Sequence, residues 1–142
     1  MKVVGVRTEK LRIRTRGSTD VVDITKDVQS ALARTGLRAG TVTVFVTGST
    51  AGVTTIEHEP GLVMDIREAL DRFAPADASY HHHERSGDDN GHSHIRASLV
   101  GPSLTVPFGE GRLMLGTWQQ IVLLDFDTRA RDRELVVQVL GE

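Results

Sequence analysis

The segment SLTVPFGEGRLMLGTWQQIVLLDF, residues 103–126, contains three candidate strands that follow one another with no helix between them. Ser103–Phe108, Arg112–Leu115 and Gln119–Phe126 are rich in apolar residues, and Gly109-Glu110-Gly111 has the composition of a hairpin turn between the first two. Three strands in direct succession do not fit a strict alternation of strands and helices. The segment therefore predicts an α+β fold.

The flanking sequence adds strands and helices to this segment. Alternating or β-branched residues predict further strands at Lys2–Arg14, Val21–Ile24, Thr41–Val46 and Glu134–Leu140. A first helix is expected to have Thr25 as its N-cap, Val28, Ala31 and Leu32 on its buried face, and Gly36 at its end. A second helix is expected from Pro60, which suits a first turn, to Pro75, which stops it. With two or three helices, we expect one domain spanning residues 1–142.

Composition excludes several classes of protein. The 142 residues carry 17 basic and 19 acidic side chains, a net charge of −2, so no nucleic-acid or anionic membrane surface is indicated. The chain has no cysteine, so a metal ion requires nitrogen and oxygen ligands. Because the first residues contain charges and no long apolar run, we expect neither a signal peptide nor a membrane span, and a cytoplasmic location.

Histidines concentrate in YHHHERSGDDNGHSH, residues 80–94, which holds five of the six in the chain. On an extended backbone His92 and His94, spaced i and i+2, point to the same side and form a two-ligand unit. His82 is a third candidate ligand, His81 or His83 is a possible substitute, and Asp88 is a carboxylate candidate. Three ligands and an open position describe a catalytic zinc-type site, whereas the alternative is a polar loop without a metal.

A loop of small residues, Thr47–Val53, follows the strand predicted at Thr41–Val46. Ser49, Thr50 and Gly52 offer hydroxyls and amide groups that suit an anion. A tight turn capped by its own hydroxyls is an equal alternative. Beyond the loop, Glu57 is a candidate general base or a carboxylate that orients a metal-binding histidine, although most such glutamates are simply solvated.

Trp118 and Gln119 stand at the entrance of a predicted strand and suit the stacking and edge recognition of a planar ring. A tryptophan packed in the core is the alternative. Further on, Arg129, Arg131 and Arg133 alternate after two aspartates. These arginines suit bidentate phosphate binding, whereas a set of ion pairs is the more usual outcome of such a pattern.

Three segments together resemble the YjbQ-like proteins, an uncharacterised family (UPF0047) often labelled secondary thiamine-phosphate synthases. They are GSTAGVTTIEHEPGL (48–62), DDNGHSHIRASLVGPSLTVPF (88–108) and GRLMLGTWQQIVLLDFD (111–127). The resemblance implies sandwich-like sheets, a homotrimer and a site where the histidines gather near the subunit interface. The positions that match the family's histidine pattern are Tyr80, His82, Asp88, Asn90, His92 and His94.

The resemblance also implies a reaction that joins an aminopyrimidine methyl diphosphate to a thiazole phosphate with loss of pyrophosphate. In that case Ser49, Thr50, Gly52 and Arg129 bind phosphate oxygens, and Trp118 with Gln119 faces a heterocycle. Glu57, Asp88 and Asn90 are then the catalytic candidates, and a divalent ion (zinc or similar, or magnesium) is held by His82, His92 and His94. The alternative is a non-enzymatic homotrimer that binds a metal or small ligand.

Overall fold

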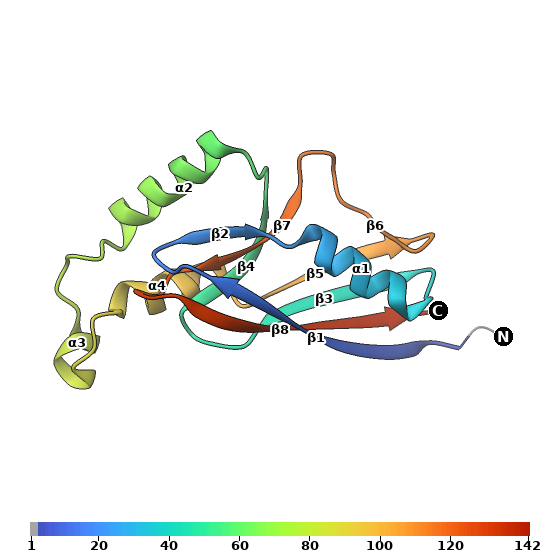
Figure 1. The fold of residues 1–142 in the computed structure, drawn as a ribbon, viewed down its shortest axis with the longest axis horizontal. Helices are drawn as coiled ribbons and strands as arrows, with labels where there is room; N and C mark the ends of the chain where they lie inside the picture. Colours follow the sequence, from blue (N-terminus) through green and yellow to red (C-terminus); the bar gives the residue numbers. More distant parts are fainter. Residues whose placement is uncertain (1–2) are drawn as a thin grey trace.

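The computed structural model of the chain describes residues 3–142, which contain eight strands and four helices (Figure 1). The strands are β1 (Gly5–Thr15), β2 (Asp20–Asp23), β3 (Gly40–Val46), β4 (Ala51–Ile56), β5 (Ser103–Gly109), β6 (Arg112–Leu113), β7 (Gln120–Asp125) and β8 (Arg131–Gly141). The helices are α1 (Thr25–Thr35), α2 (Pro60–Phe73), α3 (His81–Ser86) and α4 (Gly91–Val100). Lys2, at the start of the first predicted strand, lies outside the described residues.

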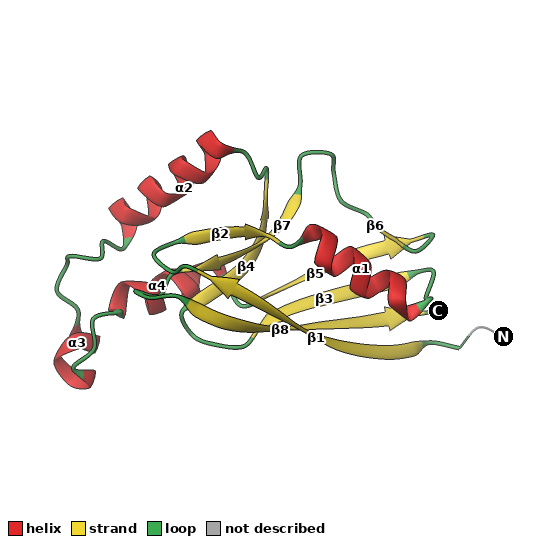
Figure 2. Cartoon of the chain, in the orientation of Figure 1, coloured by secondary structure: helices red, strands yellow, loops and turns green. Residues whose placement is uncertain are grey.

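The strands form two antiparallel sheets (Figure 2). The larger sheet has the order β1-β8-β3-β5-β6 and the smaller one β2-β7-β4. The predicted hairpin joins β5 to β6, with Phe108 opposite Leu113 and with Glu110 and Gly111 at positive φ in the turn. β7, the last of the three successive strands, leaves this sheet and becomes the centre of the smaller one. The α+β class is confirmed.

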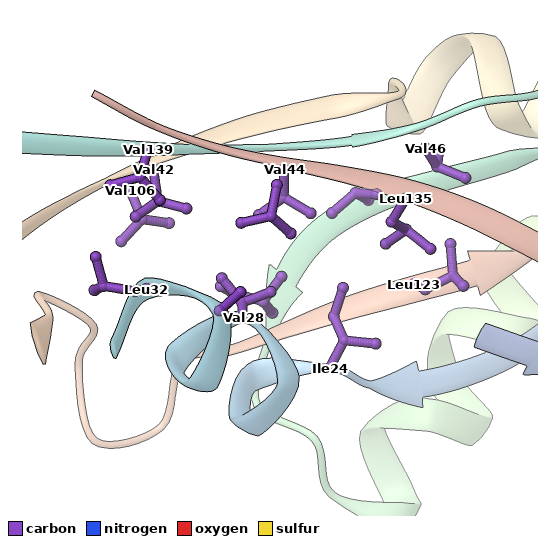
Figure 3. Close-up of a cluster of buried hydrophobic side chains, with 14 of the residues drawn as sticks. Ile24, Val28, Leu32, Val42, Val44, Val46, Val106, Leu123, Leu135 and Val139 are labelled. Carbon is purple, nitrogen blue, oxygen red and sulfur yellow. The ribbon is translucent and has the colours of Figure 1, made fainter. Parts of the chain in front are cut away.

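The main core lies between the two sheets and under α1. Figure 3 shows Val28 and Leu32 of α1 pointing toward the valines of β3 and β8. In β3, Val42, Val44 and Val46 are fully buried, whereas Phe45 points to the opposite face and is exposed. Burial of each such valine or leucine stabilises the fold by roughly 1.5–3 kcal/mol, so this core fixes the position of β7 and β8.

β7 is buried on both faces, and it therefore forms the middle layer of the fold. Ile121 and Leu123 belong to the main core. Val122 and Leu124 belong to a second cluster, which includes Ala97 of α4 and partly buried side chains of α2. This second cluster places α4, and with it two of the histidines, against the smaller sheet.

The extended backbone expected for His92 and His94, in the histidine segment 80–94, is not present. Gly87 ends α3 with a left-handed backbone, and α4 begins at Gly91, so the segment is largely helical and the helices number four within residues 3–142. The physical reason is tertiary, because Ala97 and Val100 pack on the smaller sheet and stabilise a helix that its glycine, serine and histidine residues do not favour.

None of the helices within residues 3–142 is long and apolar enough to cross a membrane.

Several predicted boundaries also shift, and two of these shifts involve contacts with β7. Ile24, not Thr25, occupies the N-cap position of α1. Thr25 is the first helical residue, and its hydroxyl accepts a hydrogen bond from Ile121 N at 2.9 Å, which ties α1 to β7. The loop expected over residues 47–53 is shortened to residues 47–50, because the residues from Ala51 onward pair with β7.

Candidate functional site

A buried network of ion pairs lies where β7 ends and β8 begins. Asp125 is fully buried, and Arg133 donates to its two oxygens from Nε at 2.7 Å and from Nη2 at 2.8 Å. Arg133 Nη2 also donates to Thr50 Oγ1 at 2.7 Å. Gly48 permits this approach, because a Cβ at that position would lie 2.9 Å from Arg133 Nη1. Arg133 therefore forms an ion pair, and its guanidinium is used in contacts within the chain.

Asp127 extends the network toward the histidine segment. Its carboxylate accepts hydrogen bonds from Arg131 Nε at 2.8 Å, from Thr50 Oγ1 at 3.2 Å and from Asn90 Nδ2 at 3.3 Å. Burial by itself raises the pKa of Asp127. The hydrogen bonds from the Thr128 amide, Arg131 and Asn90 outweigh burial and lower this pKa to about 2.

This shift predicts a pH dependence of stability. Because the folded-state pKa lies below the ordinary value of 3.8, Asp127 stabilises the fold above that value, and the contribution is lost as pH falls toward 2. We expect the melting temperature of the wild type to fall more steeply over this range than that of Asp127→Asn. The matched control is Asp132→Asn, which removes an exposed carboxylate. Equal slopes for the wild type and Asp127→Asn would contradict the prediction.

A polar pocket of about 500 Å³ opens beside Asp127, lined by residues 87–90 and 127–129. It brings together Asp88, Asn90 and Arg129, three of the residues singled out in the sequence. The pKa of Asp88 is lowered mainly by a hydrogen bond from the Asp89 amide, with a smaller contribution from the charge of Arg129. The pocket therefore combines ionised carboxylates with one guanidinium.

Asn90 has an unusual environment in this pocket. The residue is 7% exposed, its Nδ2 donates to Asp127, and its Oδ1 is buried without a hydrogen-bond partner. Leaving a buried amide oxygen unpaired costs free energy, and such groups are rare. Asn90 Oδ1 is therefore an unused hydrogen-bond acceptor at the wall of this pocket.

The histidines divide into separate groups. His92 and His94 lie on α4, not on an extended backbone, so their side chains diverge by about 200° around the helix. His94 meets His82 of α3, with ring centroids 4.6 Å apart. His92 is buried, its Nδ1 has no hydrogen-bond partner, and burial, with smaller contributions from nearby positive groups, lowers its pKa.

Within residues 3–142 of one chain, His82, His92 and His94 do not converge on one metal site. Among residues 3–142 no group of three or more His, Asp or Glu side chains has an arrangement that would hold a metal ion. The pair His82 and His94 supplies two ring systems close together, and His92 points elsewhere. The residues of a single chain therefore do not fit the expected ligand set.

His83 has a role that the sequence pattern did not reveal. Its Nε2 accepts a hydrogen bond from Gly91 N at 2.9 Å and so caps the N-terminus of α4. The ring also packs edge-on against Tyr80, whose hydroxyl donates to Pro75 O at 2.6 Å. In the sequence, Gly91 is the residue that relates to this packing, because a Cβ at that position would lie about 3 Å from the rings of Tyr80 and His83. Of the three consecutive histidines, His82 is the one that faces His94.

Some polar groups of the predicted anion loop are already used in contacts within the chain. The hydroxyl of Thr50 bridges Arg133 and Asp127, which makes it a link in the buried network. Gly52 lies in β4, where a Cβ would be 2.8 Å from Val100 Cγ1, so its position serves close packing on α4. Ser49 is exposed.

The remaining predicted site residues lie at the opposite end of β7. Trp118 is 73% exposed, so the alternative of a core tryptophan is wrong. Gln119 Nε2 donates to Thr55 Oγ1 at 3.2 Å, and exposed Glu57 follows β4 at the same end. At about 3.3 Å per residue, roughly 20 Å separates this end from Asp127. Within one chain the predicted residues therefore form two groups.

Comparisons of the sequence with known proteins all point to one family. A family model described as "UPF0047 protein YjbQ-like" matches residues 9–142. A UPF0047 protein of Methanothermobacter thermautotrophicus is 39% identical over 137 residues, which cover 96% of this chain and 94% of the relative. The UPF0047 protein YugU of Bacillus subtilis is 33% identical over 132 residues, covering 92% and 97%.

Solved structures agree with these relatives. A YbjQ-like protein of unknown function from Sulfolobus solfataricus superposes with a TM-score of 0.93 at 34% identity, covering 99% of this chain and 100% of that one. An uncharacterised protein of the YjbQ/UPF0047 family from Clostridium acetobutylicum gives a TM-score of 0.84 at 35% identity, covering 92% and 98%. Family and fold are thus supported by both sequence and structure.

Proposed function

The chain belongs to the YjbQ-like UPF0047 family, and we propose that it is an enzyme of the secondary thiamine-phosphate synthase type that acts on small phosphorylated heterocycles. In this reaction the thiazole nitrogen attacks the methylene carbon of the pyrimidine diphosphate. A new C–N bond forms, the C–O bond to the diphosphate breaks, and pyrophosphate leaves with the electron pair.

The observation that carries the proposal is the polar pocket beside Asp127. Asn90 Oδ1 is buried beside it without a hydrogen-bond partner, and the Arg129 guanidinium in its lining suits a phosphate oxygen. The exposed hydroxyl of Ser49 is a further candidate for phosphate. Asp88 and Asn90 would hold a divalent ion that arrives with the diphosphate, and the ion would neutralise the charge of the leaving pyrophosphate, since magnesium is commonly bound through few protein ligands and substrate phosphates.

We further propose that the site is completed between chains of a homotrimer. The division of the predicted residues into two groups, about 20 Å apart in one chain, supports this arrangement. Trp118 and Gln119 of one subunit then face the polar pocket of a neighbour. The same arrangement gives the pair His82 and His94 a third ligand from another subunit, because one chain supplies only two.

The experiment that tests the proposal measures product formation and bound metal together. We expect wild-type protein, supplied with both heterocyclic substrates, to form thiamine phosphate above background by HPLC, and to contain a divalent transition metal when purified without chelator. The variant His82→Ala/His94→Ala is expected to lose the metal and to lower the rate at least about 100-fold. The variant Thr8→Val, on the exposed face of β1, is the control and is expected to match the wild type.

Two results would contradict the proposal. If the wild type and the double variant form product at the same background rate, the enzyme assignment fails and a non-enzymatic ligand-binding trimer becomes the better account. If their metal contents are equal, the histidine pair is not a metal site.

A further inference from the structure

A second pocket lies in the seam between the two sheets, where the edge strand β4 faces β5. At one end β4 is tied to the chain just before β5, because Val53 N donates to Gly101 O at 3.0 Å. Beyond this bond the strands separate around a pocket of about 220 Å³, lined by residues 54–55, 104–107, 114–115 and 119. The seam pocket, as we call it, shares no lining residue with the polar pocket beside Asp127.

Backbone groups of both strands point into this seam. Phe126 N donates to Thr50 O, so the even-numbered residues of β4 bond to β7 and the odd-numbered ones, including Thr55, turn their N–H and C=O groups away from it. In β5, the bond from Val46 N to Pro102 O shows that the even-numbered residues form hydrogen bonds with β3. The backbone N–H and C=O groups of Thr105 therefore face away from β3. Within the described residues, no strand pairing joins Thr55 to Thr105.

The side chains that line the seam pocket are uncharged. They comprise three threonines, one glutamine and five apolar residues. The Gln119 amide is held in place, since its Oε1 accepts from Gly116 N at 3.0 Å while Nε2 donates to Thr55 Oγ1. The polar pocket, in contrast, is lined by three aspartates and an arginine. The seam pocket therefore selects a neutral ligand, because an unpaired charge in such a lining would lose its solvation.

We propose that the seam pocket is a binding site for a neutral aminopyrimidine ring. A ring nitrogen beside an amino group presents an acceptor and a donor side by side, which match the N–H and C=O groups that an edge strand leaves free. The apolar side chains contact the ring faces. A volume near 220 Å³ suits one small ring, since drug-sized ligands occupy pockets of about 300–1,000 Å³.

An added peptide strand fits this seam less well. Pro107 has no N–H group, which removes one donor that strand addition would use. Met114 N already donates to Pro107 O at 2.9 Å, so that end of the β5 edge is closed. The remaining free edge is short and favours a small molecule.

The test uses full-length wild-type protein and 4-aminopyrimidine as the probe. In amide NMR spectra we expect shifts that saturate with a dissociation constant of about 1 mM, as is usual for so small a ligand, and that centre on Thr55 and Thr105. Trp118, the only tryptophan, precedes Gln119, so its fluorescence provides a second readout. Pyrimidine, which lacks the amino donor, is the matched ligand and is expected to bind at least about fivefold more weakly.

Variants locate the site independently. Thr55→Val keeps the shape of the side chain but removes the hydroxyl that anchors Gln119, and the double variant Thr55→Val/Gln119→Leu is expected to weaken binding at least about tenfold. Thr8→Val is the matched control and is expected to leave affinity unchanged. Shifts that centre on Asn90 and Thr128, affinity unaffected by the double variant, or no saturable binding of the probe would each overturn the proposal.

The choice of an aminopyrimidine as ligand rests on the proposed function, whereas the geometry of the seam does not. Binding at Thr55 and Thr105 by a protein that forms no thiamine phosphate supports the seam site and rejects the synthase. Product formation by a protein in which the probe shifts only the polar pocket rejects the seam site and supports the synthase.

Discussion

Arg133→Leu is expected to destabilise the fold by about 3–5 kcal/mol, because it leaves Asp125 charged, fully buried and without its bidentate partner. The substitution also removes a hydrogen bond to Thr50 and so loosens the loop at residues 47–50. For a domain of this size the melting temperature should fall by roughly 10 °C or more. Urea denaturation at neutral pH measures the free energy of unfolding directly.

The control separates the buried pair from a simple loss of charge. Arg12→Leu removes an exposed arginine of β1 and should change stability by less than about 1 kcal/mol. The double variant Asp125→Leu/Arg133→Leu should recover much of the loss, because no buried charge is then left without a partner. If Arg133→Leu behaves like Arg12→Leu, the network does not stabilise the fold.

Local sequence patterns were sufficient for most strands, because their signals are short in range. β-branched residues predicted β3, alternating residues predicted β1, and the glycines at positions 109 and 111 marked the hairpin between β5 and β6. The pattern did not reveal that β7 pairs with β2 and β4, since that choice depends on contacts between residues far apart in sequence. The continuous apolar run of β7 reflects burial on both faces, which is a consequence of this placement.

The candidate site was harder to predict, because it depends on backbone conformation. Residue type singled out Arg129 and the family resemblance singled out Asn90, and the fold brings both into one pocket. The geometry expected for His92 and His94 was wrong, since packing of Ala97 and Val100 on the smaller sheet makes the segment helical. Periodicity gave no warning, because a polar helix of ten residues owes its stability to tertiary contacts.

A trimer with shared sites predicts that two inactive variants restore each other. Asn90→Leu removes the buried acceptor of the polar pocket, and Trp118→Ala removes the exposed ring at the far end of β7. Each variant alone is expected to lower kcat/KM for thiamine phosphate formation at least about 100-fold. Light scattering should give about three times 15.5 kDa for the wild type and for both variants, which shows that assembly is intact.

Co-expression of the two variants in equal amounts then tests where the site lies. A site between chains is intact only when the polar pocket comes from a Trp118→Ala chain and the Trp118 side chain comes from a neighbouring Asn90→Leu chain. With random assortment each condition holds for half of the chains, so about one quarter of the sites, and of the wild-type activity, should return. Asn90→Leu mixed with Asp88→Ala is the control and should recover nothing, since both changes lie in the same pocket. Mixed trimers that stay as inactive as the separate variants would place the two groups of residues in unconnected sites. The reason is that activity must return at a shared site whenever one chain supplies an intact polar pocket and its neighbour supplies an intact Trp118.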